Sequence, residues 1–272
     1  MSKRSEKRIE YLSDHHKNFA TVFSSLTERY GRFKVWSDFV TMTACAISNA
    51  CDLRFAKERE AMYMEAVKRY SKEEAEQISE LFTETILALE DNPEQDFLGG
   101  IFGTLNLHNE WQGQFFTPYH IGAFMAKATL PGLNEELMHK QTVSVCDPCC
   151  GAGCLLIACA NEVGKMNINY QDKILFVAQD IDFTAAMMCY IQLSLLGCQA
   201  IVKVGNSLSD PFTTHEPMSD KLWLTPMLVL KNGIAKLHSA DTVVLGKDDQ
   251  NGKSRKETPI EGGQAVEGPV SA

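Results

Sequence analysis

The chain has 272 residues, of which 44% are hydrophobic and 22% are charged. This length allows one large or two small domains with a substantial core. The formal net charge of −9 argues against a protein whose whole surface binds nucleic acid. The sequence contains no apolar run long enough for a membrane span. The opening residues, "MSKRSEKRIEYL", lack the apolar segment of a secretion signal. Together with nine cysteines, an odd number, these features predict a cytoplasmic protein with reduced thiols.

The first part of the chain predicts helices. Residues 5–50 and 55–90 place apolar side chains at helical spacing, and Ser71 followed by Glu74 is typical of a capping box that starts a helix. The segment "DNPEQDFLGG" then breaks the pattern. Lys and Arg outnumber acids by eight to four in the first 35 residues, which a solvated helix face explains better than a phosphate-binding patch. We therefore expect a helical region over residues 1–110.

The second part alternates between strand and helix patterns. Short β-rich runs cover residues 142–147, 173–180 and 200–206, and helical patterns at 153–165 and 183–197 separate them. This alternation predicts an α/β fold with a parallel, doubly wound sheet. We expect this domain to cover residues 111–240. Residues 241–272 are rich in Gly, charge and small polar residues, so we expect a disordered tail there.

The segment "TVSVCDPCCGAGCLLIACANE" predicts a strand, a tight turn and a helix. Gly151 and Gly153 allow the backbone to approach a ligand closely, and the helix offers its first N–H groups. In a parallel sheet, ligands bind at the carboxyl ends of the strands. The next two strands end near Asp180, which can bind a ribose diol, and Asn206, which can meet an adenine edge. These three strand ends predict a nucleoside pocket.

The four cysteines near this turn raise the alternative of a metal site. They include a C-x-x-C, but the chain has neither a second C-x-x-C nor a histidine pair at zinc spacing. Cys146 ends a strand and Cys154 begins a helix, so their side chains are expected to diverge. The sequence therefore favours cysteines that act as small residues in a crowded turn, and we predict no metal.

Two motifs carry a family resemblance. "GQFFTPYHIGAFMAKA" (113–128) followed by "DPCCGAG" (147–153) resembles the S-adenosylmethionine-binding core of N6-adenine DNA methyltransferases. The likeness is nearest to the modification subunits of type I restriction systems and extends over residues 1–235. It implies a Rossmann-like methyltransferase sheet after a helical region, S-adenosyl-L-methionine as cofactor, DNA as substrate, and a specificity or partner protein subunit.

The resemblance also implies which residues bind the cofactor. "QDID" occupies the place of the family's ribose-binding segment, with Asp in place of Glu. Asn206 stands where the family has Asp or Asn near the cofactor adenine. The cofactor-binding residues implied are Phe115, Phe116, Thr117, Pro118, Asp147, Pro148, Gly151, Gly153, Asp180, Asp182 and Asn206.

The catalytic element departs from the family pattern. The family has an Asp, four residues, then Asn, Asp or Ser followed by Pro-Pro and an aromatic residue. In "SDKLWLTPML", Asp220 is followed after four residues by Thr225, Pro226, Met227 and Leu228. Thr225 and the Pro226 backbone would replace the acceptors that hold the adenine amino group, and Leu228 cannot stack on a flipped base. The motif is therefore degenerate, and the sheet is expected to be incomplete at its C-terminal end.

Three hypotheses follow from the sequence. The first is an S-adenosylmethionine-binding DNA adenine-N6 methyltransferase of a restriction-modification type system. The second is a catalytically inactive relative that acts as an accessory or regulatory partner. The third is a fragment that needs a partner chain, in which case Trp223, Leu224, Met227 and Leu228 would be partly exposed at an unfinished sheet edge.

Overall fold

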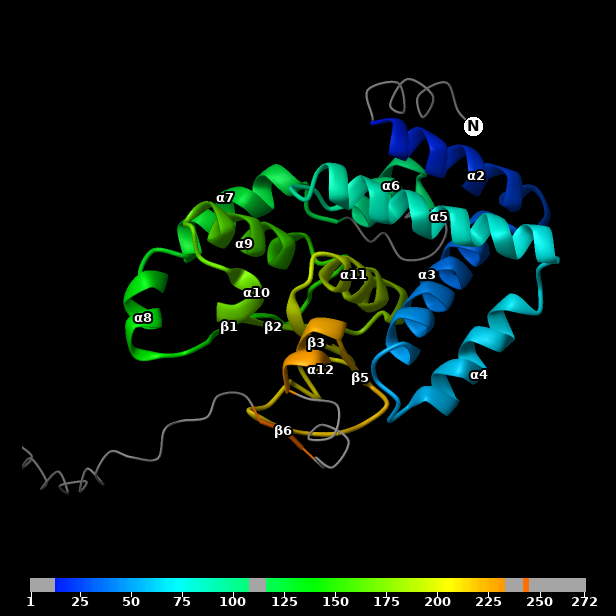
Figure 1. Cartoon of the computed structure of the whole chain (residues 1–272). Helices are drawn as coiled ribbons and strands as arrows, with labels where there is room; N and C mark the ends of the chain where they lie inside the picture. The colour runs from blue at the N-terminus through cyan, green and yellow to red at the C-terminus, as the bar shows by residue number, and fades with distance from the viewer. Residues whose placement is uncertain (1–12, 108–115, 233–241, 245–272) are drawn as a thin grey trace, which may run out of the picture.

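The computed structural model describes residues 13–107, 116–232 and 242–244. It is a mixed α/β structure in which helices form the N-terminal part and a small mixed sheet lies beneath them (Figure 1). The predicted segments at 1–12, 108–115, 233–241 and 245–272, which include most of the expected tail, lie outside the described residues. No helix in the described part is long and apolar enough to cross a membrane.

The N-terminal part is helical as predicted. Its helices are α2 (Asp14–Tyr30), α3 (Arg32–Asn49), α4 (Ala56–Val67), α5 (Lys72–Asp91) and α6 (Phe97–Thr104). Gly31, at φ +77°, separates the first two. The predicted capping box is confirmed, because the Glu74 N–H donates to Ser71 Oγ at 3.2 Å and the Ser71 N–H donates to Glu74 Oε2 at 2.8 Å. The break after α5 is shorter than expected, since α6 includes both glycines of "FLGG".

The sheet begins after two short helices. Helices α7 (Tyr119–Thr129) and α8 (Leu133–His139) lead into β1 (Val143–Asp147), and the chain continues through α9 (Cys154–Lys165), α10 (Tyr170–Lys173), β2 (Ile174–Asp180), α11 (Phe183–Leu195) and β3 (Gln199–Val204). Strands β1, β2 and β3 are parallel neighbours, as the alternating pattern predicts.

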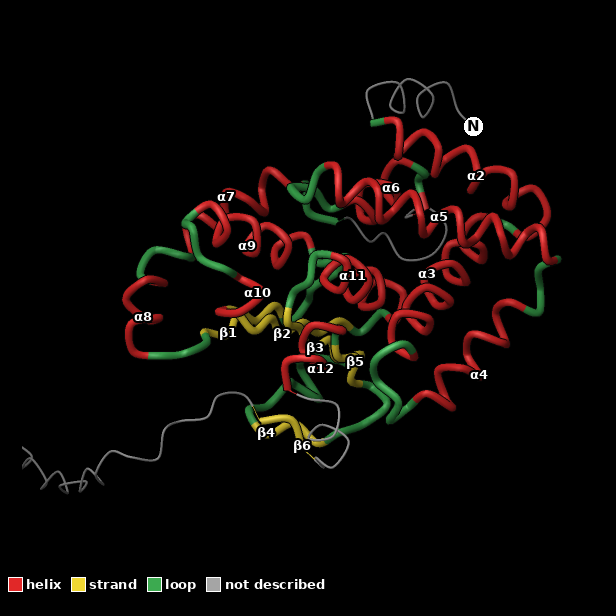
Figure 2. The backbone as a smooth tube through the Cα atoms, in the orientation of Figure 1, coloured by secondary structure: helices red, strands yellow, loops and turns green. Residues whose placement is uncertain are grey.

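The end of the sheet differs from a purely parallel arrangement. Strand β5 (Leu222–Leu224) pairs antiparallel with β3, so the strand order is β1-β2-β3-β5. Helix α12 (Pro226–Asn232) follows it. Strands β4 (His215–Pro217) and β6 (Thr242–Val244) form a separate antiparallel pair below the main sheet (Figure 2). Residues 242–244 of the expected disordered tail therefore form a strand.

The two faces of the sheet are covered unequally. Side chains such as Phe176, Ala178 and Val202 face α9 and α11 and belong to the large hydrophobic core. Ile201 and Leu224 face the other way, into a smaller cluster with Leu228 and Val229 of α12. The large core also contains Phe19, Trp36 and Phe97 of the helical region, so it runs continuously across the boundary predicted at residue 110.

A buried arginine joins the helical region to the sheet. Arg59 of α4 is 2% exposed, and its guanidinium donates to the Leu222 carbonyl of β5 at 2.8 Å and to Asp52 Oδ2 at 3.2 Å. The guanidinium carbon also lies 4.3 Å from the centre of the Trp223 ring. Trp223 is buried beneath this guanidinium, and Leu224 and Leu228 are buried in the small cluster on the other face of the sheet. The hypothesis of a fragment that needs a partner chain predicts partial exposure of Trp223, Leu224, Met227 and Leu228, but only Met227 is partly exposed.

We expect Arg59→Met to lower the free energy of unfolding by about 3 kcal/mol. Methionine leaves the Leu222 carbonyl and the buried Ser48 hydroxyl without their guanidinium donor and removes the charge over the Trp223 ring, whereas Asp52 keeps its ion pair with Arg54. Urea unfolding followed by circular dichroism measures the change. Lys72→Met is the matched control, because Lys72 forms only an exposed pair with Glu76 at 4.0 Å, worth about 0.5 kcal/mol or less. Equal effects of the two substitutions would contradict the role of Arg59.

Candidate functional site

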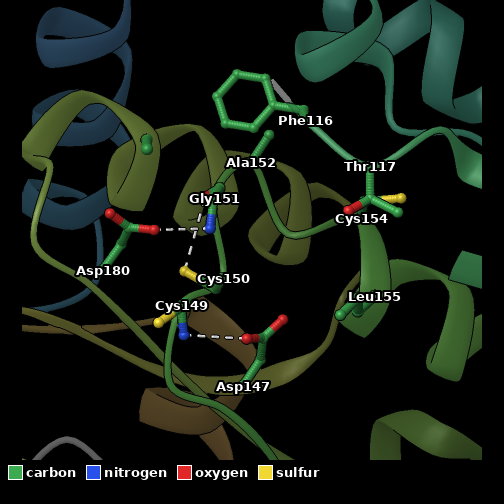
Figure 3. A pocket seen from close by; sticks show the side chains of 11 residues that line it. Phe116, Thr117, Asp147, Cys149, Cys150, Gly151, Ala152, Cys154, Leu155 and Asp180 are labelled. Carbon is green, nitrogen blue, oxygen red and sulfur yellow. Dashed lines mark hydrogen bonds between the residues drawn. The ribbon is translucent and has the colours of Figure 1, made fainter. Parts of the chain in front are cut away.

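A pocket lies at the carboxyl ends of β1 and β2, where the turn after β1 meets the segment before α7 (Figure 3). Its volume is about 210 Å³. The strand ends and the turn bring together groups that are far apart in the sequence, as expected for a parallel sheet. The lining residues are Phe116, Thr117, Asp147, Cys149, Cys150, Gly151, Ala152, Cys154, Leu155, Asp180 and Ala185.

The turn that lines the pocket is fixed by two hydrogen bonds that its backbone N–H groups donate to the end of β2. The Gly151 N–H donates to Asp180 Oδ2 at 2.8 Å, and the Cys150 N–H donates to the Gln179 carbonyl at 2.9 Å. Gly151 has φ +53°, and a Cβ at this position would lie 3.0 Å from the Phe116 ring. Glycine is therefore required here both by the backbone conformation and by the close approach of the aromatic ring.

Two neighbouring carboxylates have different roles. Asp180 lines the pocket and also accepts the Asp182 N–H at 2.9 Å through Oδ1. Asp182 instead caps α11, since its Oδ1 accepts the Ala185 N–H at 2.7 Å. The "QDID" segment thus uses its first acid in the pocket and its second at a helix start.

Asp147 has the most unusual environment among the lining residues. Its Oδ1 accepts the Cys149 N–H at 3.1 Å, but Oδ2 is buried and has no hydrogen-bond partner within the described chain. The residue is only 9% exposed. Burial raises the pKa of the Asp147 carboxyl, the Cys149 N–H partly offsets this rise, and the negative charge of Asp180 adds to it. The site therefore presents an acceptor for a donor group of a bound molecule.

Three cysteines line the pocket, although the sequence interpretation gave them no binding role. Burial raises the pKa of Cys154 to about 12, and the pKa of Cys150 is raised by its hydrogen bond with Cys189 and by burial. These two thiols therefore stay protonated at neutral pH. Among the described residues, no group of three or more His, Cys, Asp or Glu side chains is placed to hold a metal ion. The signal that could have identified the cysteines is their position inside the glycine turn itself.

The predicted cofactor residues divide into two sets. Phe116, Thr117, Asp147, Gly151 and Asp180 come together in the pocket. The other predicted residues are absent from its lining, and Phe115 lies outside the described residues. Those placed elsewhere are Pro118 at the start of α7, Pro148 in the exposed part of the turn, Gly153 at the start of α9 against Cys189, Asp182 at the start of α11, and Asn206 in the exposed loop after β3.

The predicted catalytic residues lie apart from the pocket. Thr225 follows β5, which is separated from β1 by β3 and β2. Its side chain is fully buried, and its hydroxyl donates to the Cys198 carbonyl at 2.6 Å and accepts the Ala200 N–H at 2.8 Å. Pro226 begins α12. Neither residue lines the pocket, and their catalytic role stays a prediction.

The arrangement is that of a mixed α/β protein with a ligand pocket at the carboxyl ends of parallel strands. Residues 95–227 match the family model of the N-6 DNA methylases, which supports that family for this segment, just under half of the chain. The match begins before α6 and ends in the first turn of α12, so it includes the whole pocket. No curated protein and no solved structure shows significant similarity to the chain.

We expect Asp147→Asn to raise the melting temperature at neutral pH. The pKa of Asp147 is higher in the folded than in the unfolded protein, so the carboxylate destabilises the fold as the pH rises through that folded pKa. Asparagine removes the buried charge and keeps an oxygen for the Cys149 N–H. The advantage should disappear at acidic pH, where the native carboxyl is protonated. Thermal unfolding at both pH values measures this, and an asparagine variant that is less stable at neutral pH would contradict it.

Proposed function

We propose that the chain binds S-adenosyl-L-methionine in this pocket, as a DNA adenine-N6 methyltransferase-like protein of a restriction-modification type system. The family match over residues 95–227 supports the class. The observation that carries the proposal is the buried, unpartnered Oδ2 of Asp147 at the pocket wall. The cofactor has an ammonium group and a ribose diol, both of which are hydrogen-bond donors.

The lining residues fit this cofactor chemically. Asp147 Oδ2 would accept from the ammonium group, and Asp180 would accept from the ribose. The Phe116 ring beside Gly151 offers an aromatic face to a sulfonium cation. The volume of about 210 Å³ is below the roughly 300–1,000 Å³ usual for ligand pockets. Part of the cofactor would therefore extend outside, toward the loop after β3, where Ser207 Oγ lies 3.8 Å from Cys149 Sγ.

When bound, the cofactor supplies a methyl group on a sulfonium, which leaves as a neutral thioether. The chain's own residues orient it: the glycine turn allows close backbone approach, and Asp180 holds this turn through the Gly151 N–H. If the protein is active, the adenine would be a flipped base whose amino group needs acceptors. Thr225 and the Pro226 backbone are the proposed substitutes, although the Thr225 hydroxyl already makes two bonds within the fold.

The engaged Thr225 hydroxyl favours a second candidate function. In this alternative, the chain binds the cofactor but performs no methyl transfer alone, and acts as an accessory or regulatory partner. The charge distribution agrees with a need for a partner subunit, because the lining residues include no Lys or Arg and the net charge is −9. Most of the affinity of proteins for the DNA backbone comes from Lys and Arg. DNA contact would therefore depend largely on another chain.

Calorimetry with S-adenosyl-L-methionine tests the cofactor proposal. We expect binding by the native chain and an affinity at least about tenfold lower for Asp147→Ala, because a hydrogen bond to a charged group contributes about 1.5–3 kcal/mol. Asp172→Ala is the matched control, since Asp172 pairs with Lys231 on the surface at 2.6 Å and does not line the pocket. A native chain that binds no cofactor would overturn the proposal.

Transfer of a tritiated methyl group to unmethylated DNA separates the two candidate functions. We expect Thr225→Val to lower the free energy of unfolding by about 1–3 kcal/mol, because the Ala200 N–H loses its acceptor. Cofactor affinity should stay unchanged, because Thr225 does not line the pocket. If the native chain transfers methyl groups and the folded variant loses transfer alone, Thr225 acts in catalysis. If the native chain binds cofactor but transfers nothing, the accessory function is supported.

A further inference from the structure

A glutamine of helix α11 makes three buried hydrogen bonds that join the pocket to the helical region. Helix α11 packs on β2 and β3 of the sheet and on α3 and α6 of the helical region (Figure 1). Gln192 of α11 is fully buried, and its Nε2 donates to the Ala152 carbonyl at 2.9 Å and to Asp96 Oδ1 at 2.8 Å. Its Oε1 accepts the Leu98 N–H at 3.1 Å. Ala152 lines the pocket, whereas Asp96 and Leu98 lie at the start of α6.

The three partners of Gln192 allow one orientation of its amide. Ala152 and Asp96 offer acceptor oxygens to the nitrogen, which carries two N–H groups, and Leu98 offers an N–H group to the oxygen. Asp96 Oδ1 also accepts the Gly99 N–H at 2.9 Å, which caps the start of α6. Because both N–H groups and the oxygen of this buried amide are engaged, Gln192 fixes the groups that it joins in one arrangement.

Helix α6 carries this connection to the aromatic side of the pocket. The ring of Phe102, which is buried, lies 5.1 Å from the Phe116 ring in an edge-on contact. The Phe116 ring lies against Gly151 and lines the pocket. Gln192 therefore holds the glycine turn directly, through Ala152, and supports the Phe116 ring indirectly, through α6.

A structural role in α6 alone does not account for all the contacts of Gln192. Two of its bonds are to groups of α6, but the third is to Ala152 of the glycine turn. The neighbouring Gly151 N–H donates to Asp180 Oδ2 at 2.8 Å, so β2 and Gln192 hold two consecutive residues of this turn. The bond to Ala152 is therefore a restraint on the pocket.

We propose that Gln192 is a positioning residue of the cofactor site, through which the helical region sets the affinity for S-adenosyl-L-methionine. This inference rests on the proposed binding of the cofactor in the pocket. Gln192 is absent from the pocket lining, so it acts through Ala152 and α6 rather than by contact with the cofactor. Groups that bind a ligand must be held within about 0.5 Å of the productive geometry. Loss of the amide would therefore weaken binding although no cofactor contact is removed.

Calorimetry with S-adenosyl-L-methionine tests this role in Gln192→Met, which removes the amide but keeps a long, unbranched side chain. We expect a dissociation constant at least about tenfold higher than that of the native chain. Gln199→Met is the matched control. Gln199 is also buried, at 5% exposure, and its Nε2 donates to the Gln171 carbonyl at 2.7 Å, but it lies at the start of β3, the end of the strand away from the pocket. Both substitutions should lower the melting temperature, and only Gln192→Met should lower the affinity.

Hydrogen exchange of the cofactor-free chain, followed by mass spectrometry, provides a second measurement that needs no ligand. We expect the peptide with residues 148–153 to exchange at least about tenfold faster in Gln192→Met than in the control, because the turn opens more readily without this bond. Equal exchange in the two folded variants, or a native affinity in Gln192→Met, would overturn the proposal. If the native chain binds no cofactor, the pocket proposal fails, and the exchange comparison alone decides whether Gln192 holds the turn.

Asp96→Ala keeps the proposal testable if the glutamine variant does not fold. It removes the cap of α6 and one acceptor of Gln192, so the cofactor dissociation constant and the exchange of the turn should both rise. Ser71→Ala is its control, because Ser71 caps α5 through the Glu74 N–H and lies outside the pocket lining. Effects on affinity and exchange that are equal in these two capping variants, or absent in Asp96→Ala, would overturn the proposal.

Discussion

The hydrogen bond from the Gly151 N–H to Asp180 Oδ2 is the interaction on which the site depends. It links the turn after β1 to the end of β2, and parallel pairing of the two strands makes it possible. The same turn places Phe116 against Gly151 and directs Asp147 into the pocket. Removing the Asp180 carboxylate would therefore affect the shape of the whole cavity, beyond the loss of one ligand contact.

The buried oxygen of Asp147 illustrates how a binding site can oppose stability. A carboxylate that is 9% exposed and half unpaired costs free energy in the folded protein. A bound molecule with a donor group would satisfy it. Ligand binding would thus offset the free-energy cost of the buried, unpaired Asp147 oxygen, which folding alone leaves in place.

Much of the fold could be predicted from local patterns. The strands ending at Asp147 and Asp180, the helices that follow them and the capping box at Ser71 depend on residues near one another in sequence, so local patterns predict them. The position of β5 depends on the buried Arg59, a contact across 163 positions, which spacing cannot show. For the same reason, the motif at Thr225 matched the expected interval but lies at the far side of the sheet. The positions of Asp147, Gly151 and Asp180 in the pocket could be predicted from the glycine turn and the strand ends. Asn206 and Asp182 lie outside its lining because their side chains accept hydrogen bonds from the local backbone.

The continuous core across residue 110 has a consequence for how this chain can be divided. Phe19, Trp36 and Phe97 pack in the same apolar interior as Phe176 and Trp223. A fragment that started at the strand-rich part would leave α11 and the β5 side of the sheet in contact with water. Trp223 would also lose the Arg59 guanidinium that covers its ring. In evolution, too, the helical segment and the pocket would have to be inherited together, because neither half could be exchanged without a matching surface on the other.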